Sequence, residues 1–278
     1  MKIVRLGVLA LAACGAPVGN VSFTTKGDGS VTEPIPADSP SKAGFVDGWS
    51  VKLKKTLMII KETTLTDSTG KVIFKQPSGL LYDLNRAGPF PVQDATDLLA
   101  KKYAKVSYAI GFDPQFQIVN MDAATVPDAA LMRNNSFGVY IEGTATKGTT
   151  SKEFQWGFAT DTLYDDCSDA ASGGAGVTVK AGATEAVELS IHADHLFLDS
   201  LTAESGKLRF DALANADKPV DGTITQDELK NVQLSAVPSM PYVVGGATEV
   251  KTLADFVLAA SRNIGHYRGG GECTVKAR

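Results

Sequence analysis

Hydrophobic and polar residues alternate along much of the chain, as in strands that bury one face. Trp49, Val51 and Leu53 alternate with polar residues, and 57–60 continues as an apolar run. A period of two places successive side chains on opposite faces of a strand. Similar segments recur along the chain, separated by turn residues such as those at 67–70. The predicted strands are 21–25, 49–60, 64–66, 71–74, 80–84, 103–112, 137–145, 153–159, 176–179 and 186–192. Short strands with regular turns predict a mainly β fold, an antiparallel β-sandwich.

A helical period appears only late in the chain. Thr252 is a suitable N-cap and Gly265 a suitable stop, so we expect a C-terminal helix over 252–264. The glycine run 269–271 has no following helix, which favours a flexible tail over a phosphate-binding loop. The apolar positions spaced i, i+3, i+4, i+7 and i+11 are Leu253, Phe256, Val257, Ala260 and Ile264.

The N-terminus carries a signal for export. Lys2 and Arg5 precede the apolar segment 6–13, which is too short to span a bilayer. Residues 11–15, Leu-Ala-Ala-Cys-Gly, resemble the bacterial lipobox, in which the cysteine becomes the lipidated first mature residue. The resemblance implies a signal peptide at 1–13 and a lipid anchor on Cys14; the alternative is an ordinary signal peptide with an incidental cysteine.

These features predict a protein tethered to the bacterial envelope. Several acyl chains anchor a protein stably, and Gly15 follows the cysteine where an aspartate would suggest retention at the inner membrane. We therefore expect the outer membrane. The Pro-, Gly- and Ser-rich residues 14–45 would form a lipidated tether with a first strand, and 46–278 the sandwich domain. The 27 basic and 31 acidic residues give a net charge of −4, without a basic stripe, which argues against nucleic acid as a partner.

Two cysteines remain after lipidation of Cys14. Cys167 and Cys273 are 106 positions apart, and an exported protein can form disulfides. We predict a disulfide between them, which would tie the C-terminal tail to the middle of the domain. Two free thiols or two metal ligands are the alternatives.

The strongest motif is an acidic loop at 217–228 within an EF-hand-like segment, 204–234. It aligns with the calcium loop D-x-[DN]-x-[DN]-G-x-I-x-x-x-E, in which glycine permits the sharp turn and the last glutamate chelates bidentately. Pro219 stands where an oxygen ligand is expected, which would weaken binding, and an acidic turn that binds nothing is the alternative. The expected calcium ligands are Asp217, Asp221, Thr223, Thr225 and Glu228.

The chain contains three histidines, and all could share an ion. His192 and His195 lie three residues apart, close enough if the strand turns into a loop or helix there. A tail folded back by a disulfide would bring His266 toward them. Three imidazoles suit zinc or copper; the alternative is that these are ordinary structural histidines.

The order of several segments resembles a family of uncharacterised bacterial lipoproteins of the myxobacterial type. The segments are Asp47-Gly48-Trp49, His192 to Phe197, the acidic loop and the closing Gly265 to Cys273. The chain is also similar in architecture to the MbnP-like copper-binding periplasmic proteins. That second resemblance implies that a metal role is reasonable; it assigns no ligand.

Three classes of function follow. The first is a non-enzymatic, envelope-anchored binding or structural protein with a calcium-stabilised β domain. The second is a transition-metal protein that holds copper or zinc through the three histidines. The third, a secreted hydrolase, is disfavoured because the HExxH and GxSxG motifs are absent from the sequence.

Overall fold

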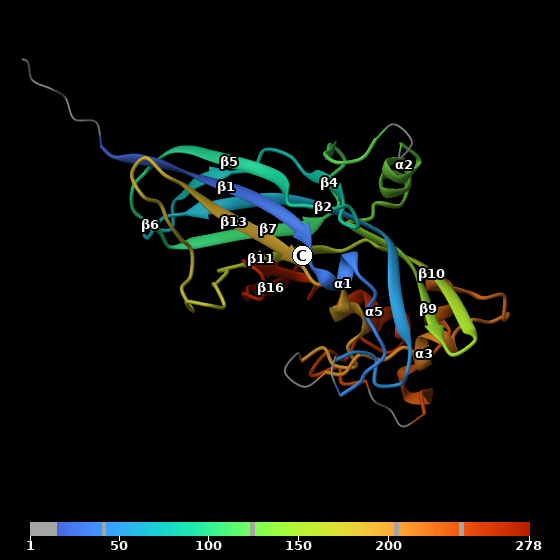
Figure 1. The fold of residues 1–278 in the computed structure, drawn as a ribbon. Helices are drawn as coiled ribbons and strands as arrows, with labels where there is room; N and C mark the ends of the chain where they lie inside the picture. Colours follow the sequence, from blue (N-terminus) through green and yellow to red (C-terminus); the bar gives the residue numbers. More distant parts are fainter. Residues whose placement is uncertain (1–15, 41–42, 123–125, 203–205, 239–241) are drawn as a thin grey trace, which may run out of the picture.

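Two packed β-sheets make up most of the fold, as the alternating pattern predicts (Figure 1). The computed structural model describes residues 16–278 apart from 41–42, 123–125, 203–205 and 239–241. The predicted signal peptide, 1–13, and the predicted lipidation site, Cys14, lie outside the described residues. Among the described helices, none is long and apolar enough to cross a membrane.

The smaller sheet has four strands, and its central pair is parallel. β1 runs beside β13 in the same direction, with Val21 opposite Glu185. The antiparallel prediction is therefore wrong for this pair, although the mainly β class is confirmed. The chain crosses to the larger sheet between β1 and β13, so the two strands are not joined by a hairpin and can align in parallel. In order across the sheet the strands are β15 (Gly265–Tyr267), β13 (Thr184–Ile191), β1 (Val18–Gly27) and β5 (Phe90–Leu99).

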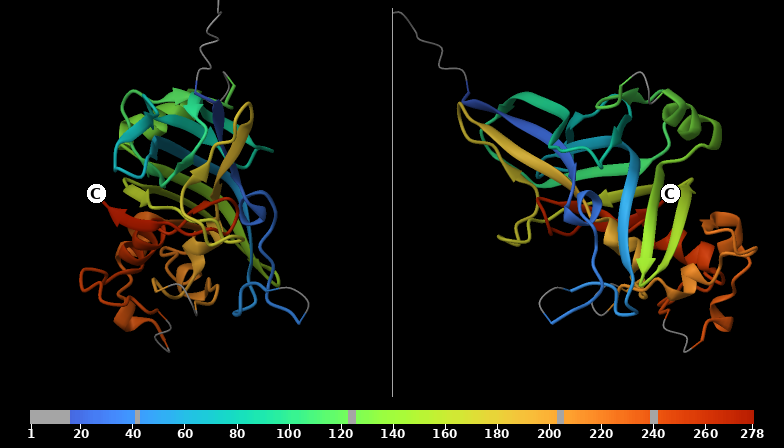
Figure 2. Two further views of the ribbon diagram at one scale, coloured as in Figure 1. Left: turned by 90° about the vertical axis from the view of Figure 1, so that its left-hand side faces the viewer. Right: turned by 45° about the vertical axis from the view of Figure 1, so that its right-hand side comes forward.

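The larger sheet is built around β2 (Ser50–Thr66), a strand of 17 residues. Its first half pairs with β9 and its second half with β7, so it runs the length of the molecule (Figure 2). The main path is β14 (Thr223–Thr225), β10 (Thr150–Phe158), β9 (Val139–Lys147), β2, β7 (Lys105–Gly111), β11 (Asp161–Asp165) and β16 (Thr274–Ala277). Beside β2 lie β3 (Val72–Lys75) and β4 (Leu80–Asp83), with β8 (Gln117–Ile118) on β4, and a separate pair joins β6 (Lys102–Tyr103) to β12 (Val177–Thr178).

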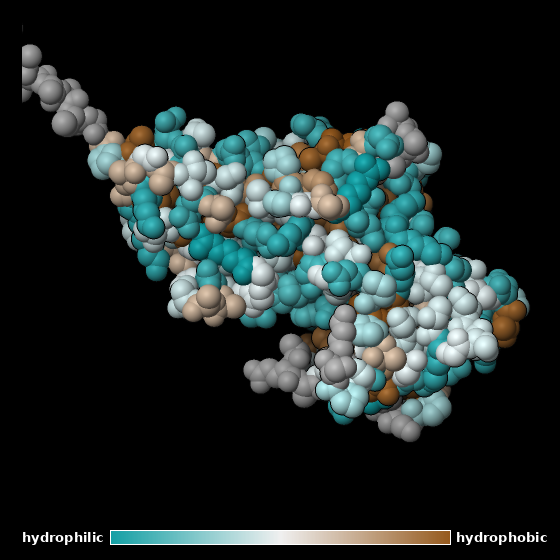
Figure 3. Space-filling view, in the orientation of Figure 1, coloured by the Kyte–Doolittle hydropathy of each residue, from teal (hydrophilic) through white to brown (hydrophobic). Residues whose placement is uncertain are grey.

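The main core lies between the two sheets. Phe23 of β1 and Leu189 of β13 belong to one buried cluster with Met58, Ile60 and Tyr108 of the larger sheet. The alternating burial along β1 follows its alternating sequence, since every second side chain points inward. The face in Figure 3 is largely hydrophilic with scattered apolar residues, as expected for a sandwich that buries its apolar residues between the sheets.

Short helices gather at one end of the sandwich, next to β9 and β10 (Figure 1). An aromatic cluster links them to the larger sheet: the rings of Phe45, Phe197 and Phe210 pack on one another, and Phe154 of β10 packs on Phe197 and Phe210. The helices of this region are the 3₁₀-helix η2 (Ala193–Phe197), α3 (Asp211–Ala214), α4 (Gln226–Lys230), the 3₁₀-helix η3 (Leu234–Ala236) and α5 (Leu253–Ala260). Elsewhere lie α1 (Gly29–Thr32) and α2 (Val126–Asn135).

The predicted C-terminal helix is present but shorter than expected. Thr252 caps α5 as predicted, in a reciprocal capping box with Asp255. The helix ends at Ala260, not at 264, because the chain must turn there to enter β15 at Gly265. The helices around the acidic loop, α3 and α4, have only four and five residues, so the described part of this segment, 206–234, lacks the long flanking helices of an EF-hand.

The C-terminal tail is structured, contrary to the expectation of flexibility at 269–271. Tyr267 and Gly271 form a backbone bridge around the glycines, and β16 adds to the edge of the larger sheet. The predicted disulfide between Cys167 and Cys273 is present, with an S–S distance of 2.02 Å. It fixes the end of this turn against the middle of the domain.

Candidate metal centre

Three histidines converge where β13 ends and β15 begins. One ligand nitrogen from each of His192, His195 and His266 lies within 4.8 Å of the other two. The ring centroids of His192 and His266 are 4.2 Å apart, and those of His195 and His266 are 4.8 Å apart. The structure therefore brings together the three residues that the sequence suggested for a transition metal.

A 3₁₀-helix aligns the first two histidines. β13 ends at Ile191, and His192 is the N-cap of η2, which contains His195. Side chains at i and i+3 eclipse in a 3₁₀-helix, whereas on a continuing strand they would point to opposite faces. The end of the strand at Ile191 thus places both imidazoles on one side.

β15 supplies the third histidine. His266 lies opposite Ser190 in the antiparallel pair of β15 with β13, and its carbonyl accepts a hydrogen bond of 3.0 Å from the Tyr108 hydroxyl. Glycine is required at 265, since a Cβ there would lie 2.6 Å from the Tyr108 hydroxyl and from the Tyr164 ring. Because glycine has no side chain, the backbone at residue 265 can pack closely against Tyr108 and Tyr164, and β15 then places the His266 side chain in the interior.

Two of the imidazoles are oriented by backbone carbonyls. His195 Nδ1 lies 2.8 Å from the Asn263 carbonyl, and His192 Nε2 lies 3.2 Å from the Gly269 carbonyl. A carbonyl can only accept, so these nitrogens carry protons, and in the neutral form of each ring the opposite nitrogen has a free lone pair. Such bonds to the non-ligating nitrogen are typical of histidines that bind metals.

His266 is the most unusual member of the cluster. It is only 4% exposed, and both ring nitrogens are buried without a partner at full hydrogen-bond geometry among the described residues. Glu272 Oε1 lies 3.7 Å from Nδ1, and the backbone of Gly271 and Asn263 interacts weakly with the ring. Burial, reinforced by the neighbouring His192 and His195, lowers its pKa from 6.5 to about 4. The ring is therefore neutral at pH 7, with a lone pair that no protein donor engages.

Two carboxylates that lie next to the histidines were not predicted from the sequence. Asp28 Oδ2 lies 3.6 Å from His192 Nδ1, and Asp28, Asp194 and His192 form a second group with ligand atoms within 4.8 Å. One oxygen of Asp194, Oδ1, is buried without a hydrogen-bond partner among the described residues. Asp194 lies between His192 and His195 in the sequence, and this position could have indicated that it belongs to the site. Asp28 lies 164 positions before His192, so no local pattern indicated its proximity.

The site opens to solvent on one side. A cavity of about 720 Å³ is lined by Asp28 and His192 together with Gly269 and Gly270 of the tail. Glu33 and Glu188 also line it, while Lys26 pairs with Glu188 at 2.9 Å. Acidic walls beside an imidazole cluster attract cations.

The acidic loop at 217–228 has its leading carboxylate paired with a lysine. Asp217 is 2% exposed and forms an ion pair with Lys152 of β10, which holds its pKa below the usual range. Its two oxygens also accept the N–H groups of Asp221 and Gly222. A calcium ion at this position would have to replace the ammonium of Lys152.

The last carboxylate of the loop is engaged by its own chain. One oxygen of Glu228 accepts the Lys218 N–H at 2.8 Å, and the other accepts the Thr225 N–H at 2.7 Å in a capping box at the start of α4. Asp221 accepts the Thr223 N–H at 2.8 Å. These bonds account for an acidic turn without an ion; calcium binding by this loop stays a prediction.

Comparison of the chain with protein-family models, with curated proteins and with solved structures finds no match. The resemblance to bacterial lipoproteins and to MbnP-like proteins thus stays a prediction.

Proposed function

We propose that this protein is a transition-metal-binding protein of the bacterial envelope that holds one zinc or copper(II) ion through His192, His195 and His266. The observation that carries the proposal is the state of His266. A buried polar group without a partner is costly, and this one lies against two further imidazoles. A metal ion among the three rings would satisfy it.

Three imidazole nitrogens favour a metal ion of intermediate softness, such as zinc or copper(II). Neutral imidazole nitrogens suit zinc and copper, and three histidines with one further position form a common zinc arrangement. Cys167 and Cys273 are joined in the disulfide, so neither offers a thiolate. Asp28, 3.6 Å from His192, is placed to complete four ligands or to orient that ring.

The geometry favours the histidines over the acidic loop as the principal ion site. Neither ring nitrogen of His266 accepts a hydrogen bond from a donor among the described residues. In the loop, Asp217 and Glu228 already accept hydrogen bonds from Lys152 and from backbone N–H groups. An ion gains more where it displaces no existing partner.

In this proposal, lipid on Cys14 holds the domain at the membrane surface, and the protein captures or delivers the ion and is not an enzyme. The cavity beside His192 supports an exchangeable site, since it gives solvent access to one side of the cluster. A purely structural zinc would be enclosed by four protein ligands.

Metal titration of the full chain, purified in detergent through a tag without histidines, tests this function. We expect one equivalent of zinc or copper(II) to bind in competition with a chromophoric chelator. His266→Gln should weaken binding by more than the roughly 10–100-fold that loss of an outer-shell partner costs, and Asp28→Asn by about that range.

Asp227→Asn is the matched control, because this carboxylate lies exposed on α4 and pairs only with Lys230 among the described contacts. It should leave affinity unchanged. A wild type that does not compete with the chelator, or a His266→Gln variant with wild-type affinity while its circular dichroism shows a folded chain, would overturn the proposal.

A further inference from the structure

One end of the sandwich lies close in sequence to the predicted lipid anchor. β1 begins at Val18, four residues after Cys14, and the chain is already held at Pro17, whose carbonyl accepts the Ala100 N–H at 2.8 Å. Because consecutive Cα atoms are about 3.8 Å apart, Pro17 lies at most about 11 Å from Cys14. The headgroup layer of a bilayer leaflet is about 5–8 Å thick. Lipid on Cys14 would therefore bring this end of the domain against the membrane surface.

We call this region the anchor end; it comprises residues 16–18 and the turns at 67–71, 99–102 and 180–183. Val18 lies opposite Leu99 at the end of β5, and the Val18 carbonyl accepts the Gly182 N–H at 2.8 Å. The Lys101 side chain reaches Asp67, directly after the last residue of β2, at 3.6 Å. Figure 1 shows the start of β1 beside β6 at one end of the sandwich, with α3 and α5 toward the other.

Two large apolar side chains are exposed at the anchor end. Val18 is 40% exposed and Leu99 is 48% exposed. They are directly opposite each other in the antiparallel pair of β1 with β5, so their side chains lie on the same face of the sheet. Figure 3 shows apolar residues beside strongly hydrophilic ones at this end. Such a pair differs from the isolated apolar residues that are normal on a soluble surface.

Exposed lysines surround these apolar residues. Lys71, Lys102 and Lys180 are exposed, and none of them forms an ion pair with a carboxylate among the described residues. Lys101 is the fourth lysine of the anchor end, and it pairs with Asp67. Three ammonium groups are thus available to an anionic partner.

The carboxylates near this end do not cancel the charge of the lysines. Asp97 is exposed, two positions before Leu99. Asp169 and Glu185 also lie nearby, but both pair with Arg268, at 3.4 and 2.9 Å. Four lysines and one arginine then stand against four carboxylates, whereas the whole chain has 27 basic and 31 acidic residues. The anchor end is therefore positive in a chain that is negative overall.

We infer that the anchor end is a membrane-contact surface that binds anionic phospholipid headgroups. Lysines near a membrane surface are attracted by the negative charge of anionic lipids. Val18 and Leu99 would enter the boundary between headgroups and acyl chains, as apolar residues of interfacial proteins do. The inference rests on the lipid anchor of the proposed function, and it adds the lipid class that the domain contacts.

This contact would orient the metal centre away from the membrane. β1 and β13 run in the same direction from the anchor end, and Gly27 at the end of β1 lies opposite Ile191, which precedes His192. Nine steps of about 3.3 Å along β1 place this point about 30 Å from the anchor end. The cavity at His192 would then face partners or solutes in solution.

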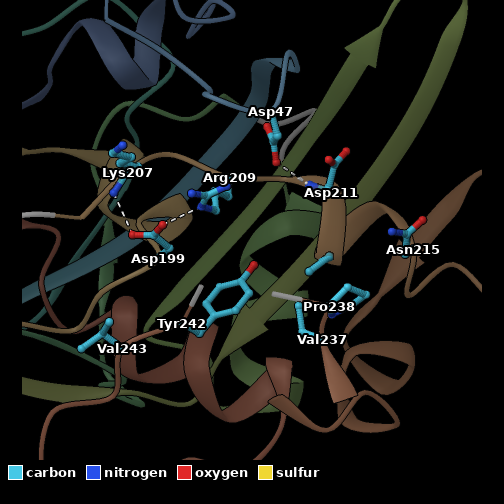
Figure 4. A pocket seen from close by; sticks show the side chains of 11 residues that line it. Asp47, Asp199, Lys207, Arg209, Asp211, Asn215, Val237, Pro238, Tyr242 and Val243 are labelled. Atoms are coloured by element: carbon cyan, nitrogen blue, oxygen red, sulfur yellow. Dashed lines mark hydrogen bonds and ion pairs between the residues drawn. The ribbon is translucent and has the colours of Figure 1, made fainter. Parts of the chain in front are cut away.

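The helical end supplies a matched control. Figure 4 shows its cavity, which Asp199, Lys207 and Arg209 help to line. Asp199 pairs with Arg209 at 2.6 Å. Lys207 is exposed and, like the three lysines of the anchor end, forms no ion pair with a described carboxylate. Lys207→Gln therefore removes an equivalent charge far from the anchor end.

Vesicle binding of the chain from residue 14 onward, with Cys14→Ser so that it carries no lipid, tests the inference. In EDTA and low salt, we expect binding to vesicles of equal parts phosphatidylglycerol and phosphatidylcholine to be about tenfold stronger or more than to pure phosphatidylcholine. Lys102→Gln should weaken binding about fivefold, and glutamine at 71, 102 and 180 together by more than about tenfold. Leu99→Ser should also weaken it, because it removes apolar area that enters the interface. Lys207→Gln should bind as the wild type does.

Equal binding to the two kinds of vesicle would overturn the inference. The same holds for a triple variant that binds as the wild type does while its circular dichroism shows a folded chain, or for an equal loss in Lys207→Gln and Lys102→Gln. The assay uses neither a metal nor a lipidated cysteine. Binding to anionic vesicles by a chain that binds no zinc would contradict the proposed metal function alone, and zinc binding without vesicle binding would contradict this inference alone.

Discussion

His266 should make the metal-free protein lose stability as the solution becomes acidic. Its folded pKa of about 4 lies below the value of 6.5 for an exposed histidine because the ring is buried beside two other imidazoles. Between these values the unfolded chain binds a proton that the folded chain does not. Stability therefore falls as the pH decreases from about 6.5 to about 4, and it is fully present above 6.5.

The magnitude follows from the size of the shift. About 2.5 pH units at 1.36 kcal/mol each give an upper value of about 3 kcal/mol for this one residue. The ring is 4% exposed, so solvent screening reduces this value little. Part of it comes from the neighbouring His192 and His195, which oppose protonation of His266.

Urea unfolding in EDTA, at half-unit steps from pH 7.5 to 4, measures this effect as the difference between the wild type and His266→Leu. Other titrating groups contribute to both curves and largely cancel. We expect the wild type to lose about 2–3 kcal/mol more than the variant over this range. Parallel stability curves for the two proteins would contradict this prediction, because they would mean that His266 takes up its proton equally in the folded and unfolded states.

Three further predictions concern the parts of the molecule outside the histidines. If the acidic loop binds calcium, calcium at about 100 times Kd should raise the free energy of unfolding of the wild type by about 2.7 kcal/mol. Glu228→Gln should abolish this stabilisation and Pro219→Asp should increase it. Equal melting temperatures of the wild type in EDTA and in millimolar calcium would show that the loop is an acidic turn that binds no ion. Replacement of both Cys167 and Cys273 by serine should cost about 4–5 kcal/mol in the chain-entropy model for a 106-residue separation, and should weaken metal binding because β15 carries His266; unchanged urea midpoints would count against it. Metabolic labelling with a palmitate analogue should mark the wild type through Cys14, and label that persists in Cys14→Ser would exclude that cysteine as the anchor.

Capping residues and the spacing of apolar residues, which are visible in short stretches of sequence, predicted some of the elements correctly. Thr252 and the apolar spacing from Leu253 located α5, and the alternation from Trp49 onward located β2. The pairing of Cys167 with Cys273 was predictable because these are the two cysteines that remain when Cys14 is assigned to the predicted lipid anchor.

Other features depend on contacts between distant segments and had no local signal. β5, Phe90–Leu99, was missed because it is an edge strand with mostly exposed residues and an irregular register. The parallel pairing of β1 with β13 joins segments more than 160 positions apart. The tail was expected to be flexible because of its glycines, whereas Tyr267 and the disulfide hold it in place.

The three histidines of the candidate metal centre were predictable as a group, but their surroundings were not. The spacing of His192 and His195 was compatible with a strand or with a turn, and only the 3₁₀-helix places them together. Asp28 joins the site because β1 lies beside β13, a pairing that the sequence did not indicate. The lysine opposite Asp217 is likewise a long-range contact, from β10 to the loop.

X-ray absorption spectroscopy of the zinc-loaded full chain shows which atoms bind the ion. We predict three imidazole nitrogens at about 2.0–2.1 Å from a single zinc ion, and loss of that imidazole signal in a variant with all three histidines replaced by glutamine. A first shell made of oxygens alone in the wild type, or the same spectrum in the triple variant, would contradict it.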